Sequence, residues 1–136
     1  MQNKTSYLII RLAIGISMFG HGLVRLPKLE TFSQGMLKSF ENSMLPEIIT
    51  LPFSYVLPIL EFTFGLFITI GLFTKQSAIV LSGVLVSLIF GSTLIESWGA
   101  ITAQLIHVAF FAYLINNIHD NSFAADRLIR KNKDIN

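Results

Sequence analysis

Four long apolar segments constrain this chain more than any other feature. They cover approximately residues 6–26, 54–73, 76–95 and 100–118. Each segment is close to the 20 or so residues that a helix needs to cross a hydrocarbon core of about 30 Å. Of the 136 residues, 52% are hydrophobic and only 13% are charged, against about 25% charged in an ordinary soluble domain. The chain is therefore expected to be an integral membrane protein in a lipid bilayer.

The connections between these segments predict how the helices are arranged. The links near residues 74–75 and 96–99 are short, so the second, third and fourth helices should be antiparallel neighbours. The one long connection, residues 27–53, carries Phe32, Met36 and Phe40 at helical spacing, which favours a short interfacial helix. We expect an all-α membrane protein: an antiparallel four-helix transmembrane bundle over residues 1–118, with an extra interfacial helix in the first loop.

Basic residues gather at one end of this expected bundle. Lys4, Lys75 and the basic residues of 127–133 fall on the same side if the chain crosses the membrane four times. The positive-inside rule then makes both termini cytoplasmic, and it explains the net charge of +2 without a nucleic-acid partner. Residues 119–136 should form a polar cytoplasmic tail, frayed or disordered. Arg11, near the cytoplasmic boundary, is expected to extend toward lipid headgroups.

Polar residues within the apolar segments predict a ligand pocket. Each ionisable one costs about 2.5 to 3.5 kcal/mol at mid-membrane, so it needs a reason to be there. With a helical rise of about 1.5 Å per residue, His21, Glu61, Gln104 and His107 lie roughly 6 to 10 Å from the outer boundary. Gln104 and His107 are three residues apart and share a helix face. With Arg25 at the rim, these residues predict a pocket in the outer leaflet.

A quinone fits such a pocket best. Its carbonyls need hydrogen-bond donors, and histidine and glutamate side chains can relay the protons of its reduction and oxidation. Haem b, held by His21 and His107, is a less favoured alternative, because paired histidines are common in membrane bundles without iron. A structural role is another: Glu61 bonded to either histidine would tie helices together. The absence of cysteine excludes thiol–disulfide and iron–sulfur chemistry, and no metal site is predicted.

Short motifs in the chain resemble those of the DoxX family. Residues 11–15 match its R-x-x-x-G opening, and residues 21–26 match H-G-x-x-K-L, with Arg25 where the family usually has lysine. The family's acidic residue on the second helix is similar to residues 60–65, which contain the sequence L-E-x-x-x-G. The basic turn that follows this helix in the family is similar to residues 71–75, which end in lysine.

This resemblance implies a multi-pass, four-helix protein of the bacterial inner membrane. The family includes quinone-linked subunits, such as those of thiosulfate:quinone oxidoreductase, and accessory proteins of methylamine utilisation. We therefore expect a redox-associated protein that acts as a subunit or accessory of an oxidoreductase, with a soluble or membrane partner; whether it is itself an enzyme stays open. The alternative is a non-enzymatic scaffold or assembly factor. A ridge of small residues, Gly83, Ser87 and Gly91, suits helix packing within the bundle or in a homo-oligomer.

Overall fold

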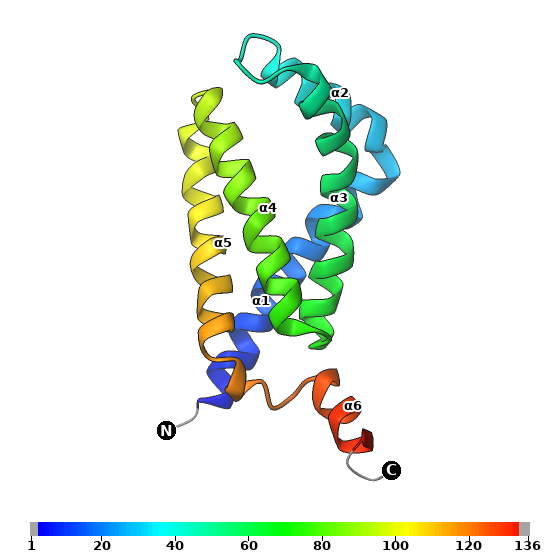
Figure 1. The fold of residues 1–136 in the computed structure, drawn as a ribbon, viewed down its shortest axis with the longest axis vertical. Coiled ribbons are helices and arrows are strands. Elements are labelled where there is room, and N and C mark those ends of the chain that lie inside the picture. Colours follow the sequence, from blue (N-terminus) through cyan, green and yellow to red (C-terminus); the bar gives the residue numbers. More distant parts are fainter. Residues whose placement is uncertain (1–2, 134–136) are drawn as a thin grey trace.

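The computed structural model describes residues 3–133 as a bundle of helices, with no strand in that range (Figure 1). Four stretches of it are long and apolar enough to cross a membrane. The predicted all-α membrane fold is therefore confirmed. In chain order the elements are α1 (Lys4–Arg25), η1 (Leu26–Lys28), α2 (Leu29–Phe40), α3 (Glu47–Ile70), α4 (Thr74–Leu94), α5 (Trp98–Asn116), η2 (Ile118–Asp120) and α6 (Ala125–Lys133).

Three of the long helices lie close to their predicted segments, and α3 differs most. It begins at Glu47, the earliest start expected for this span, and runs through Pro52 and Pro58. Proline is tolerated within membrane helices because neighbouring groups can satisfy the freed carbonyls. The helix ends at Gly71, whose φ of 75° is left-handed. The N–H of Leu72 then donates to the Phe67 carbonyl at 2.8 Å, which closes the last turn in the way glycine favours.

Helices α1 and α3 pack closely through glycines. A Cβ on Gly22 would collide with the backbone of Phe62, and one on Gly65 would collide with the backbone of Phe19. Small residues at such positions let two backbones approach in a membrane, where van der Waals packing is a principal driving force for helix association. This close crossing fixes the two helices relative to each other and places Arg25 of α1 beside Glu61 of α3.

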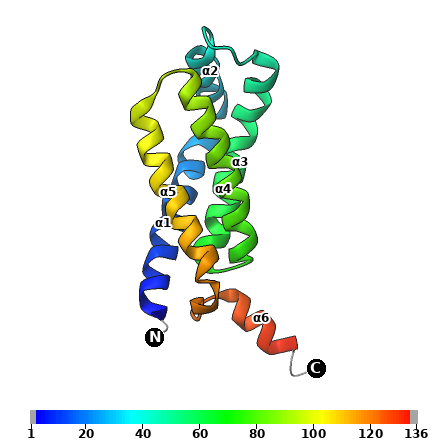
Figure 2. The same ribbon diagram turned by 60° about the vertical axis from the view of Figure 1, so that its left-hand side comes forward.

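The other helices form pairs that diverge toward the end opposite the termini. The predicted extra helix, α2, packs along the first half of α3, where the buried hydroxyls of Ser33 and Ser54 bond at 2.6 Å. Helices α4 and α5 run side by side and antiparallel. In the view of Figure 1 the α4–α5 pair separates from the α2–α3 pair toward the top, while Figure 2 shows α1 and α5 together near the N-terminus.

The apolar core occupies the half of the bundle nearer the termini. It is made of side chains from all four long helices that are at most 4% exposed: Tyr7, Ile14, Met18, Ile68, Ala78, Leu81, Leu85, Phe111 and Leu114. Beyond this core, where the helices diverge, apolar side chains no longer fill the space between them. The polar residues predicted to form the pocket lie at that level.

The expectation for Arg11 is wrong, and the first part of the C-terminal tail is held against the bundle. Arg11 is only 3% exposed, and its guanidinium donates to Asn121 Oδ1 at 3.0 Å and to the Phe123 carbonyl at 2.6 Å. These acceptors belong to the segment after α5. The guanidinium of Arg11 is therefore bound within the protein and does not extend toward lipid headgroups. Residues 119–126 accordingly fold against the end of the bundle.

Asp126 completes this C-terminal attachment. Its carboxylate accepts from the backbone N–H groups of Phe73 and Thr74, at 2.7 and 3.1 Å, and so caps the start of α4, which has unpaired N–H groups like every helix N-terminus. Asn121 also donates to the Thr74 hydroxyl at 3.0 Å. The chain after α5 thus joins the starts of α1 and α4.

Candidate functional site

A cavity of about 260 Å³ lies where the helices diverge, and all five predicted pocket residues line it. His21 and Arg25 come from α1, Glu61 from α3, and Gln104 and His107 from α5. The rest of the wall is mainly apolar and includes residues of α2 and α4. The structure therefore brings together residues up to 86 positions apart in the chain, from His21 to His107. Their binding of a ligand stays a prediction.

Arg25 and Glu61 form an ion pair at the side of this cavity. Glu61 is 3% exposed, and the two atoms of the closest contact, Arg25 Nη1 and Glu61 Oε2, lie 2.5 Å apart. The guanidinium carbon of Arg25 also lies 4.7 Å from the centre of the Phe32 ring, a cation–π arrangement. The partner of Glu61 is thus Arg25, and the alternative in which Glu61 bonds to His21 or His107 is wrong. Arg25 lies close enough to neutralise the buried carboxylate.

His107 is held by two hydrogen bonds that fix its ring. Its Nδ1 lies 2.8 Å from the Ala103 carbonyl, and its Nε2 lies 3.0 Å from the Ser17 hydroxyl. Because a carbonyl only accepts, Nδ1 must carry the proton, and in the neutral ring Nε2 accepts from Ser17. His107 therefore ties α5 to α1.

His21 has a different environment. Its Nδ1 donates to the Ser17 carbonyl at 2.7 Å, within its own helix. Its Nε2 has no hydrogen-bond partner in residues 3–133, and the ring is exposed beside the cavity. The His21 and His107 rings lie edge to face, with centroids 6.3 Å apart. His21 thus makes no hydrogen bond to another helix, and its free nitrogen is available to a bound molecule.

Gln104 also keeps a free polar atom. Its amide nitrogen donates to the Ser92 hydroxyl at 3.0 Å, which links α5 to α4. Its Oε1 is buried and has no hydrogen-bond partner within the described chain. A buried acceptor without a partner costs about 1 to 3 kcal/mol, so a donor from water or a ligand is expected there.

Three residues that help to build the site were not predicted from the sequence. Ser17 orients both histidines, Ser92 holds Gln104, and Phe32 covers Arg25. Ser17 has a sequence signal, since it lies four residues before His21 on the same helix face. Ser92 and Phe32 carry none, because their roles depend on how distant helices meet.

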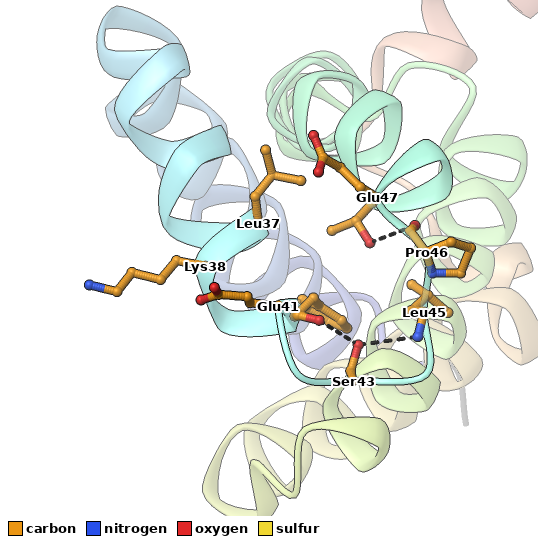
Figure 3. Close-up of a pocket in the computed structure, with 9 residues that line it drawn as sticks. Leu37, Lys38, Glu41, Ser43, Leu45, Pro46 and Glu47 are labelled. Carbon is orange, nitrogen blue, oxygen red and sulfur yellow. Dashed lines mark hydrogen bonds between the residues drawn. The ribbon is translucent and has the colours of Figure 1, made fainter.

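A second, larger cavity of about 460 Å³ lies at the connection between α2 and α3 (Figure 3). Two dashed bonds in Figure 3 belong to the turn: Ser43 donates to the Phe40 carbonyl at 2.8 Å and accepts from the N–H of Leu45 at 3.2 Å. The third lies at the start of α3, where the Thr50 hydroxyl donates to the Pro46 carbonyl at 3.3 Å. The carboxylates at the edge of this cavity, Glu41 and Glu47, belong to exposed residues. None of the predicted pocket residues lies here, and we interpret this hollow as the surface of a structured turn.

Comparison with known proteins agrees with this architecture. The model of the DoxX family matches residues 6–94, which include His21, Arg25 and Glu61 and end before α5. No curated protein and no solved structure matches the chain. A match over more than half of the chain is sufficient to assign the family, so this four-helix membrane protein belongs to the DoxX family.

Proposed function

We propose that this DoxX-family protein binds the head group of a quinone-like, lipid-soluble molecule in the cavity beside His21, Arg25, Glu61, Gln104 and His107. The observation that carries the proposal is that two residues lining the cavity each keep a polar atom without a hydrogen-bond partner in the described chain: Nε2 of His21 and the buried Oε1 of Gln104. A cluster that served only to join helices would be expected to use its hydrogen-bonding groups among themselves.

The chemistry of the cavity suits both redox forms of such a molecule. A quinone carbonyl accepts hydrogen bonds, and Arg25 has N–H groups besides the Nη1 that binds Glu61. A quinol hydroxyl donates, and Gln104 Oε1 is a free acceptor. His21 Nε2 is exposed and unpaired within the described residues, so it is placed to take or give a proton as the bound molecule is oxidised or reduced.

Electrons for this chemistry would come from a partner protein. The chain has no cysteine for thiol or iron–sulfur electron transfer. We therefore place it as a subunit or accessory of an oxidoreductase in the bacterial inner membrane, with both termini in the cytoplasm, as its basic residues near the termini favour. The outward-facing Gly83 and Ser87 of α4 leave a surface free for a second membrane subunit or another copy of the chain.

Haem b suits the cavity less well. An axial histidine would bind iron through Nε2 while Nδ1–H donates to a carbonyl, and His21 is arranged in this way. In His107, however, Nε2 already accepts from Ser17 at 3.0 Å. Ligation would require that bond to break and the ring to leave its present position.

The test is the quinone content of the purified protein. Full-length protein and its His21→Ala variant are purified in mild detergent, and quinone in the organic extract is measured by mass spectrometry per mole of protein. We expect His21→Ala to lose most of the quinone. Once both proteins are freed of quinone, we expect equal thermal unfolding temperatures, because His21 makes no hydrogen bond to another helix. His119→Ala, at the other end of the bundle, is the matched control. Equal quinone content in all three proteins would refute the assignment.

A structural role is the second candidate, and specific bonds favour it. Polar pairs join α1 to α3 (Arg25–Glu61), α1 to α5 (Ser17–His107) and α4 to α5 (Ser92–Gln104). A scaffold or assembly factor of this kind would lose stability in Glu61→Gln and contain no quinone even as the wild type. The same extraction and unfolding measurements therefore separate the two candidates.

A further inference from the structure

The cavity is open on one side. Of the residues that line it, only His21, Ala100 and Ala103 are exposed, and they lie on α1 and α5. The lining residues of α3, Leu57 and Glu61, are buried at 1% and 3% exposure and form its back wall. The cavity therefore opens between α1 and α5.

The surface around this opening is apolar. On α1, Val24 is 58% exposed, and on α5, Ile106 and Phe110 are 51% and 40% exposed. In a helix that crosses a membrane, exposed side chains of this kind contact the acyl chains of lipids. At the opening itself α5 presents small residues, Ala100 and Ala103, so the mouth is not covered by a large side chain. The opening is thus flanked by apolar side chains that are suited to the hydrocarbon region.

A contact between α2 and α4 lies near the cavity. The ring of Phe40, at the end of α2, lies against Gly91 of α4, 3.1 Å from where a Cβ would be. Along α2 and α4 both residues lie beyond the last lining residues, Met36 and Leu88, while on α5 the lining extends to Ala100. The contact joins the two diverging helix pairs.

The size of the cavity limits what it can hold. Pockets that enclose a drug-sized molecule usually measure about 300 to 1,000 Å³, and this one measures about 260 Å³. It has room for a single ring but not for a prenyl or alkyl chain as well. Any long tail on the bound molecule must lie outside.

The geometry points to a lateral opening between α1 and α5 through which the tail of the bound molecule runs into the bilayer, past His21 and Ala103. This inference rests on the proposed function and defines the ligand class further: an amphiphile with a ring-sized polar head and a long apolar tail. In this arrangement His21 lies at the mouth of the cavity, beside the point where the polar head of the bound molecule joins its apolar tail.

Photolabelling of the full-length protein tests this inference. A benzoquinone with a decyl tail that carries a diazirine is irradiated with the protein in phosphatidylcholine nanodiscs, and labelled residues are mapped by mass spectrometry. We expect label on the faces of α1 and α5 beside the opening, such as Val24 and Ile106, and loss of that label when excess unlabelled decylubiquinone is present.

Two other photolabelling results would each overturn the lateral opening, and they differ in what they mean for quinone binding. Label that is lost on competition but lies on the outer faces of α3 or α4, for example at Tyr55 or Val86, would overturn the lateral opening and leave quinone binding intact. The absence of any competable label would refute the proposed function and this inference with it.

A pair of variants sharpens the test. Ala103→Trp fills the mouth of the opening, whereas Ala109→Trp adds the same side chain to an exposed position of α5 outside the cavity. We expect Ala103→Trp to lose the competable label and Ala109→Trp to retain it. Equal labelling of the two variants would contradict the inference, and the wild-type map decides the matter if Ala103→Trp does not fold.

Discussion

Arg25 reaches Glu61 through a single nitrogen: its Nη1 donates to both carboxylate oxygens, at 2.7 and 2.5 Å. This differs from the usual fork of two parallel bonds from two guanidinium nitrogens. Lysine also presents its charge on one nitrogen. The geometry therefore predicts that lysine, which stands at this position in the H-G-x-x-K-L pattern, can serve the same carboxylate as arginine.

Replacement of Arg25 tests this explanation. Arg25→Met leaves the buried Glu61 carboxylate without its cation, and breaking a buried pair in this way costs about 3 to 5 kcal/mol of unfolding free energy. Arg25→Lys should cost clearly less, because one ammonium can approach both oxygens and only the contact with Phe32 changes. Unfolding by titration with sodium dodecyl sulfate in mixed micelles measures both. Equal losses for lysine and methionine would show that the guanidinium group itself is required and that a single charged nitrogen is not sufficient.

The close crossing of α1 and α3 predicts a contrast between two glycines of the same helix. In Gly22→Ala the new Cβ meets the backbone of Phe62, so the helices must separate, at a cost of about 1 to 3 kcal/mol or more. In Gly20→Ala nothing lies within 4 Å of the new Cβ, and the better helix propensity of alanine should stabilise by up to about 1 kcal/mol. The thermal unfolding temperature in detergent should therefore fall in Gly22→Ala and rise in Gly20→Ala. A decrease for both would contradict the prediction.

The sequence was sufficient to predict the helical bundle and the residues that line the cavity. It was not sufficient to predict which side chains those residues bind. Apolar length predicted α1, α4 and α5 closely, and counting depth along each helix brought His21, Glu61 and His107 to one level. Depth contains no information on rotation about the helix axis or on side-chain reach. For this reason Arg25 was predicted at the rim, whereas it bends inward to Glu61.

The C-terminal segment shows a second limit of sequence reasoning. A polar composition predicted a frayed tail, yet Asn121 and Asp126 fold it onto the bundle. These bonds join Arg11 to Asn121 across 110 positions and Phe73 to Asp126 across 53. No local pattern signals pairs that far apart in the chain, because the acceptors become visible only when the starts of α1 and α4 are adjacent to the end of α5.

Asp126 should hold this segment in place through the cap on α4. Asp126→Ala removes the acceptor of two backbone N–H groups, and loss of a capping side chain costs about 0.5 to 2 kcal/mol. We expect faster hydrogen–deuterium exchange at the start of α4 and in residues 119–133, measured by mass spectrometry. Glu96→Ala, at the other end of α4, serves as control and should leave this exchange unchanged. Unchanged exchange in Asp126→Ala would show that the remaining bonds, from Arg11, from Asn121 to Thr74 and from the backbone of residue 126 to Gly71, are sufficient to hold the segment.

Both histidines of the cavity should carry the proton of the neutral ring on Nδ1, which is the less common tautomer. They should respond differently to Ser17→Ala. Both Nδ1 atoms face backbone carbonyls, at 2.7 Å in His21 and 2.8 Å in His107, so in the neutral rings Nδ1 carries the proton. Nitrogen-15 NMR of labelled histidine, recorded well above the ordinary histidine pKa of about 6.5, distinguishes the two tautomers. Ser17→Ala removes the hydroxyl that bonds His107 Nε2 but keeps the carbonyl that bonds His21. The Nε2 resonance of His107 should therefore shift while the signals of His21 stay in place. A shift of His21 alone would mean that its unpaired nitrogen, and not that of His107, lies beside Ser17.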